Sequence, residues 1–193
     1  MIKQVSWNWK EVANISSSDL EIINLLSVTL TREKQTALEN EFARYADAVN
    51  HIIRTIMREH IPTAAKTIVA VQEKFAERFD PRLEYLQDVI KSARVTIGRH
   101  RRMASLVRTM RGQMPRFQEG KMLFSEPIVK LGSKGVRLFI TRNDVIPIPF
   151  DKHSRNTESE TLADLERKKR RFDRIRFTQH REGFVELDVR VIG

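Results

Sequence analysis

Cysteine is absent from the 193-residue sequence, which excludes disulfides, thiol nucleophiles and cysteine-ligated zinc. Apolar runs are short, and none approaches the roughly 18 residues that a membrane-spanning helix needs. Residues 1–10 also lack the apolar stretch of a signal peptide. These absences lead us to expect a cytoplasmic protein without a membrane partner.

Signatures of catalysis are equally scarce. The histidines, His51, His60, His100, His153 and His180, are scattered, and the sequence has neither an HExxH motif nor a glycine-rich phosphate loop. The carboxylates of residues 33–47 alternate with lysine and arginine on a predicted helix surface, where solubility explains them. We therefore expect no enzyme activity, no metal and no cofactor.

Acidic residues are missing where basic residues are most frequent. The chain has a formal net charge of +10 and a pI near 10.2, yet residues 89–117 contain no aspartate or glutamate. A run of one sign predicts contact with a polyanion, and phosphate backbones are the commonest such partner; the alternative is a solvated helix face. The basic residues of this window are Lys91, Arg94, Arg99, Arg101, Arg102, Arg108, Arg111 and Arg116.

Three smaller features each leave two interpretations open. The cluster Arg167, Lys168, Lys169, Arg170 and Arg171 is flanked by acidic residues, so it is either a second phosphate contact or a solvated segment. Phe117, beside Arg116, is either a stacking platform for a base or a core residue. Trp7 and Trp9 either fill a groove on the protein's own surface or stack on bases.

Apolar periodicity predicts a block of helices in the first half of the chain. Residues 31–61 have apolar positions at intervals of four and three, and residues 63–79 continue the pattern. Asp80 and Pro81 supply the N-cap and first position of a third helix. Gly98 interrupts or ends that helix, and residues 99–110 can form a fourth.

The second half has the alternation and turn signals of strands. We expect strands at 122–131, 136–141, 145–150, 174–178 and 184–191, a loop at 151–160 and a short helix at 162–172. Pro147 and Pro149 place 145–150 at a sheet edge. An early strand at 22–30 must pair with one of these, because a single strand is not stable.

The predicted fold is therefore α+β. Residues 22–30 and 113–193 form a small, OB-like β-barrel, and residues 31–112 form an inserted bundle of three to four helices. Residues 1–21 are an N-terminal arm.

Several short stretches, by their order and spacing, resemble the N-terminal half of the TnpB (OrfB) proteins, which are transposon-encoded RNA-guided nucleases related to compact type V CRISPR effectors. The resemblance covers roughly residues 24–193. The stretches are 30–35 (LTREKQ), 45–50 (YADAVN), 86–93 (LQDVIKSA), 115–117 (PRF) and 146–150 (IPIPF).

In that family a wedge barrel and an inserted recognition lobe grip the guide RNA and its target DNA. The resemblance thus implies that residues 91–111 line a nucleic-acid channel and read backbone geometry while base pairing reads sequence. The family's RuvC-like nuclease, with its catalytic acids, and its zinc ribbon have no counterpart in these residues. The first 20 residues of this sequence have no counterpart in the family.

Three functions follow from these observations. The leading hypothesis is a non-catalytic nucleic-acid-binding module, whose partner is guide RNA, DNA or both. A second is part of a split RNA-guided nuclease whose catalytic chain is separate. A third is a helical adaptor or inhibitor that binds a protein through residues 31–61. The sequence leaves RNA or DNA preference and oligomeric state open.

Overall fold

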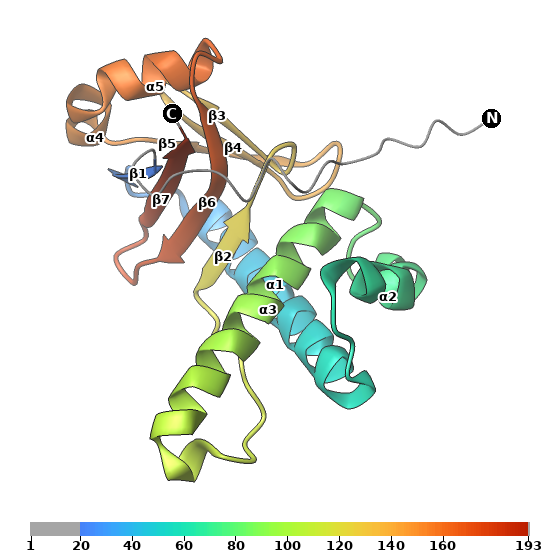
Figure 1. The fold of residues 1–193 in the computed structure, drawn as a ribbon. Coiled ribbons are helices and arrows are strands. Elements are labelled where there is room, and N and C mark those ends of the chain that lie inside the picture. Colours follow the sequence, from blue (N-terminus) through green and yellow to red (C-terminus); the bar gives the residue numbers. More distant parts are fainter. Residues whose placement is uncertain (1–19, 193) are drawn as a thin grey trace.

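A computed structural model describes residues 20–192 and is mixed α+β (Figure 1). Helices and strands separate along the chain as the sequence predicts, with the long helices inserted between the first and second strands. The predicted arm at 1–21, with Trp7 and Trp9, lies almost wholly outside the described residues.

Three helices form the inserted block. They are α1 (Arg32–Glu59), α2 (Ala64–Arg78) and α3 (Leu83–Leu106). The predicted apolar stripe of α1 is buried, including Phe42, Val49 and Ile52, and α1 packs against α3. Thr63 caps α2 by accepting a hydrogen bond from the Lys66 backbone N–H at 3.2 Å.

The third helix differs from its prediction at both ends. It begins at Leu83 rather than at Pro81, and the Asp80 carboxylate accepts hydrogen bonds from the backbone N–H and the guanidinium of Arg82. It then passes through Gly98, where an added Cβ would meet no atom within 4 Å. The predicted fourth helix is wrong: only the short 3-10 turn η2 (Arg108–Met110) follows.

The strands form two antiparallel sheets. The first has the order β1-β7-β6-β2, made of β1 (Leu20–Leu26), β2 (Lys121–Phe124), β6 (Arg171–Gln179) and β7 (Val185–Ile192). The second has the order β3-β4-β5, made of β3 (Val129–Gly132), β4 (Gly135–Phe139) and β5 (Val145–Pro149). The pairing of β1 with β7 confirms that the first strand needs the end of the chain.

A closed barrel is not confirmed. The two sheets meet at one isolated bridge between Ser27 and Phe150, while β2 and β3 remain outer strands of their sheets within residues 20–192. The predicted single strand at 122–131 is two strands separated by a turn at 125–128. β5 lies at an edge of its sheet, as its prolines predict.

The segment predicted as a loop at 151–160 is largely helical. It contains α4 (Lys152–Thr157) and the start of α5 (Ser159–Glu166), because Asp151 Oδ1 accepts a hydrogen bond from the Ser154 N–H at 2.7 Å and caps α4. Since α5 ends at Glu166, the basic cluster at 167–171 occupies a turn and the first residue of β6 instead of a helix.

Candidate nucleic-acid interface

The end of α3 leaves the body of the protein. Ile97 is the last buried residue of this helix, and no residue from 98 to 114 is buried. We call residues 98–114 the α3 arm; they comprise the last turns of α3, η2 and the chain that turns back toward β2, and they project from the lower end of the molecule (Figure 1).

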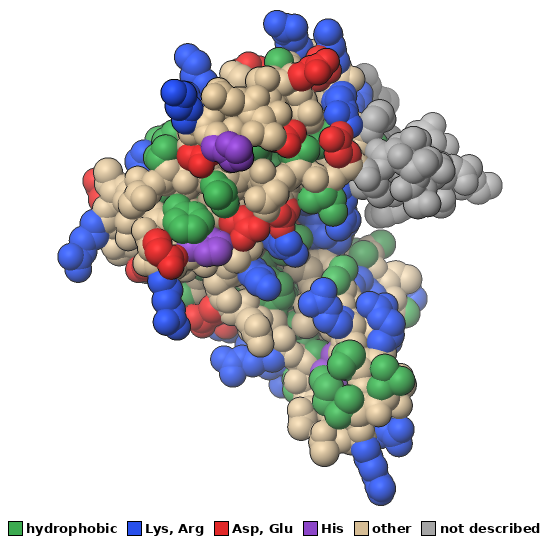
Figure 2. Space-filling model, turned by 90° about the vertical axis from the view of Figure 1, so that its left-hand side faces the viewer, with side chains coloured by type: hydrophobic (Ala, Val, Ile, Leu, Met, Phe, Trp, Pro, Cys, Tyr) green, Lys and Arg blue, Asp and Glu red, His purple; other side chains and the backbone are tan. Residues whose placement is uncertain are grey.

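The α3 arm carries arginine without any carboxylate. Five of the predicted contact residues lie on it, and none forms an ion pair within the described part of the chain. On the face drawn in Figure 2, Lys and Arg side chains surround a group of hydrophobic ones on this lower lobe. The five are Arg99, Arg101, Arg102, Arg108 and Arg111.

Arg111 also has a structural task. Its guanidinium donates hydrogen bonds to the carbonyls of Ala104 and Ser105, at 3.2 and 3.4 Å, in the last turn of α3. These carbonyls have no partner within the helix, so Arg111 caps its C-terminal end. Arg99, Arg101, Arg102 and Arg108 are exposed and make no such contact.

The other three basic residues of the predicted window lie elsewhere. Lys91 pairs with Asp173 of β6 at 2.6 Å. Arg94 donates to the carbonyls of Ile61 and Pro62 and to the Thr67 hydroxyl, and so fixes the turn between α1 and α2. Burial lowers the pKa of Arg94, and the nearby charge of Arg101 lowers it further.

Arg116 and Phe117 follow the arm and return to the body. Arg116 lines a hollow beside α1 whose other charged residues, Asp47, Arg54 and Glu119, mix signs. Phe117 packs against the core, with its ring 5.8 Å from that of Tyr45. This partly buried placement agrees with the interpretation of Phe117 as a core residue, because one side of its ring packs against Tyr45.

The second predicted cluster is divided among different contacts. Lys169 lies 3.6 Å from Asp164, and Arg170 pairs with Glu21 at 2.7 Å. Arg171 is exposed at the start of β6. Lys168 adopts a left-handed backbone conformation, with φ of 58°, and reaches a basic groove that the sequence did not predict.

This groove lies on the second sheet and has a volume of about 910 Å³. We call it the sheet groove. Lys130 and Arg137 are direct cross-strand neighbours on β3 and β4, an arrangement of like charges that destabilises a sheet. Five cations and two carboxylates line it: Lys34, Lys130, Lys134, Arg137, Lys168, Glu126 and Glu166.

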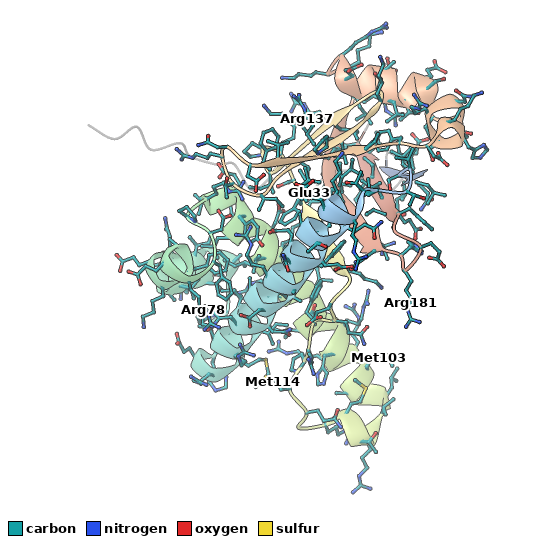
Figure 3. All side chains as sticks on the ribbon, turned by 180° about the vertical axis from the view of Figure 1, so that it is seen from behind. Glu33, Arg78, Met103, Met114, Arg137 and Arg181 are labelled. Atoms are coloured by element: carbon teal, nitrogen blue, oxygen red, sulfur yellow. The ribbon has the colours of Figure 1, made fainter. Side chains whose placement is uncertain are left out.

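The two basic surfaces lie far apart on the molecule. In Figure 3, Arg137 lies beside the second sheet at the upper end, whereas Met103 marks the α3 arm at the lower end. The helical block stands between them. A ligand that contacts both must therefore be extended.

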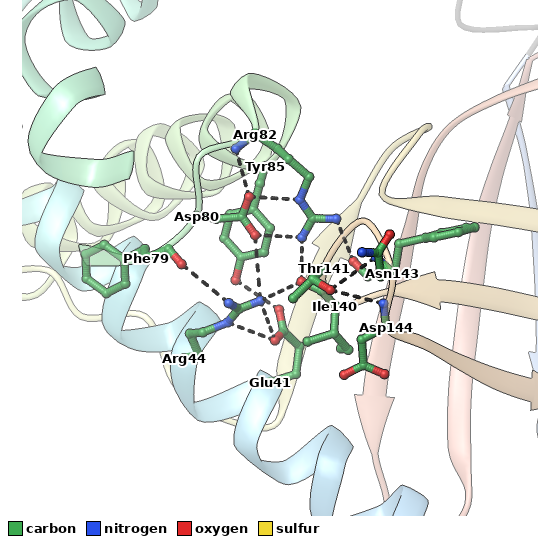
Figure 4. Close-up of polar contacts among 11 residues, drawn as sticks. Glu41, Arg44, Phe79, Asp80, Arg82, Tyr85, Ile140, Thr141, Asn143 and Asp144 are labelled. Atoms are coloured by element: carbon green, nitrogen blue, oxygen red, sulfur yellow. Dashed lines mark hydrogen bonds and ion pairs between the residues drawn. The ribbon is translucent and has the colours of Figure 1, made fainter. Parts of the chain in front are cut away.

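A buried ionic joint connects the helical block to β4 and the turn after it (Figure 4). Arg82 pairs with Asp80 at 2.6 Å and donates to the carbonyls of Phe139 and Ile140, both at 2.7 Å. Arg44 pairs with Glu41 at 2.7 Å and donates to the Ile140 carbonyl at 3.2 Å.

The carboxylates of the joint are buried, and each is paired with an arginine. Asp80 and Glu41 are 4% and 3% exposed, and Tyr85 donates a hydrogen bond to Glu41 at 3.1 Å. Burial raises the pKa of Glu41, and the Arg44 contact opposes that rise. Because each buried charge has a partner, the joint fixes the base of α3 against the second sheet.

A third buried carboxylate ties α3 to the residue that follows β2 of the first sheet. Asp88 Oδ2 accepts hydrogen bonds from the backbone N–H and the hydroxyl of Ser125, at 2.7 and 2.9 Å. Burial raises the pKa of Asp88 to about 6, although these bonds and the charges of Arg174 and Lys91 oppose the rise. Asp88 has no histidine or second carboxylate among these partners, so its contacts are those of a structural group.

Neither a metal centre nor a membrane span is found in the described chain. Among residues 20–192, no group of three or more histidine, aspartate or glutamate side chains is placed to hold a metal ion. No helix of this part is both long enough and apolar enough to cross a bilayer.

Comparison with known proteins returns neither a matching family model nor a matching curated protein. The resemblance to TnpB-type proteins therefore stays a prediction that rests on the short stretches quoted above.

Proposed function

We propose that this chain is a non-catalytic nucleic-acid-binding module whose principal contact is the α3 arm. The observation that carries the proposal is the group of five arginines on a projecting segment without a carboxylate partner. Elsewhere in the protein, arginines such as Arg44, Arg82 and Arg176 pair with acids. Like charges held together repel one another, and a polyanion removes that repulsion.

The sheet groove supports a polymer as the ligand. A small anion can occupy one basic surface only, whereas a phosphate backbone can continue from the arm to the groove around the helical block. Electrostatic contacts of this kind supply affinity without sequence preference. By the TnpB resemblance the polymer is guide RNA, its target DNA or both, and a separate nuclease chain would supply any catalysis.

The first test is the salt dependence of binding. Fluorescence anisotropy with labelled single-stranded RNA should give a slope of log K against log salt of about −3.5, if about five phosphates are neutralised. A DNA of the same sequence compares the two backbones. An affinity that does not change with salt contradicts the proposal.

The second test reverses charge on the arm. Arg101→Glu, Arg102→Glu and Arg108→Glu together should abolish retention of RNA and leave the melting temperature nearly unchanged, because these exposed side chains hold no contact in the fold.

A matched control changes the net charge equally. Arg58→Glu, Lys66→Glu and Lys74→Glu reverse three exposed cations on α1 and α2, outside the arm. This variant should keep most of the affinity. An equal loss in both triple variants would mean that only net charge matters, and the arm would not be the interface.

A further inference from the structure

The α3 arm exposes large apolar side chains among its arginines. Leu106 is 80% exposed and Met103 is 42% exposed, and Val95 precedes them on the same helix at 52%. Single exposed apolar residues are normal on proteins, and Val69 of α2, at 85%, is one of them. On the arm, by contrast, apolar residues gather, as the lower lobe in Figure 2 shows.

Helical spacing places these residues on one face together with two arginines. Residues three or four positions apart are neighbours on a helix surface, which joins Arg99 to Met103 and Arg102, and both Arg102 and Met103 to Leu106. We call Arg99, Arg102, Met103 and Leu106 the tip face. Met114 lies on the opposite side of the arm in Figure 3 and does not belong to it.

The tip face combines two chemistries that suit one ligand. Its arginines complement phosphate, and its leucine and methionine offer an apolar surface of the kind that proteins insert between base steps. A base presents a flat, weakly hydrated face between two phosphates, so both requirements are met within one nucleotide step. An anionic bilayer is the less suitable occupant, because a flat surface at the tip cannot also reach the sheet groove at the far end.

We propose that the tip face opens a base step of a duplex, with Leu106 and Met103 against the unstacked bases and Arg99 and Arg102 on the flanking phosphates. This inference rests on the proposed function and adds the mode of contact. Phosphate contacts hold the arm in place, and the apolar side chains replace part of the lost stacking.

The test uses the full chain and a short duplex with 2-aminopurine at a central step, because this base becomes more fluorescent when it is unstacked. The wild-type protein should raise the fluorescence on binding. Met103→Ser with Leu106→Ser should remove that rise and weaken binding about tenfold, because the apolar contact with the unstacked bases is lost. The salt slope should stay unchanged, because no phosphate contact is lost.

Val69→Ser is the matched control, as it removes an equally exposed apolar side chain from α2. It should bind and unstack like the wild type.

The outcomes separate this inference from the proposed function. If the Met103 and Leu106 variant binds and unstacks like the wild type while the arginine triple variant does not bind, the inference is wrong and the proposed function stands. If the wild type retains no RNA or DNA, both are wrong. Binding of the wild type to phosphatidylserine vesicles, lost in the Met103 and Leu106 variant, would assign the tip face to a membrane and overturn the inference.

Discussion

The ionic joint and the α3 arm use the same residue type in opposite ways. At the joint, Arg44 and Arg82 each have a carboxylate within 2.7 Å and a backbone carbonyl from the β4 segment. On the arm, Arg99 and Arg102 have neither. The difference shows that an arginine acts in the fold where an acid or a backbone carbonyl lies within reach, whereas Arg99 and Arg102, which have neither, are available to a partner.

The largest predicted effect breaks the joint. Asp80→Ala leaves the buried guanidinium of Arg82 without its carboxylate, which should lower the free energy of unfolding by about 3–5 kcal/mol. Urea unfolding followed by circular dichroism measures the change. Asp47→Ala is the control, because Asp47 pairs with Arg78 at 3.2 Å in a half-exposed position and should cost less than about 1 kcal/mol. Equal losses would contradict the role of the joint.

The next effect concerns the Asp88 contact at the base of the arm. Because burial raises its pKa from 3.8 to about 6, the folded chain binds more protons than the unfolded chain between these pH values. The stability that protonated Asp88 contributes is complete below pH 3.8 and is lost as pH rises through about 6. Compared with Asp88→Asn, the wild type should therefore lose about 3 kcal/mol between these limits.

Parallel unfolding measurements of both proteins from acid to neutral pH test this. Arg174 and Lys91 are the charged groups near Asp88, and both are present in the wild type and in the Asp88→Asn variant. If the difference in free energy of unfolding between the two proteins does not change with pH, the pKa of Asp88 is not raised in the folded chain and the prediction is wrong.

The smallest effect extends the comparison to the sheet groove. Arg137→Glu replaces a like-charged cross-strand pair with an opposite one, so the free energy of unfolding should rise by about 0.5 kcal/mol. Nucleic-acid affinity should fall at the same time. This combination is expected if Arg137 binds a partner at some cost to stability. A variant that loses stability without losing affinity would mean instead that Arg137 stabilises the fold.

The helices were predictable because their signals are local. The apolar stripe of α1 alone gave its length to within a few residues, and the pairing of the first strand followed from its isolation. The break at Gly98 was predicted wrongly because a helix tolerates one glycine when the residues on both sides continue the helix. The helices α4 and α5 were less predictable than the long helices. The start of α4 depends on the single cap Asp151, and an aspartate side chain forms a turn as readily as a helix cap.

The candidate site was predicted in part for a similar reason. The absence of acidic residues from 89–117 is visible in the sequence, and this range includes the α3 arm. The partners of Lys91 and Arg170, Asp173 and Glu21, come from distant positions, so only the fold reveals them. The sheet groove was missed although Lys130 and Arg137 alternate with buried residues along their strands; their pairing depends on register.

α3 is one uninterrupted rod that is held at one end only. Its nine residues beyond Ile97 extend about 13 Å into solvent, at 1.5 Å per residue. In its first turn, Tyr85 packs against Tyr45 of α1 and Phe124 of β2. The helix is thus anchored by an aromatic cluster at its N-terminal part and free at its C-terminal part. A force on its free end would therefore act on the packing between α1, α3 and β2.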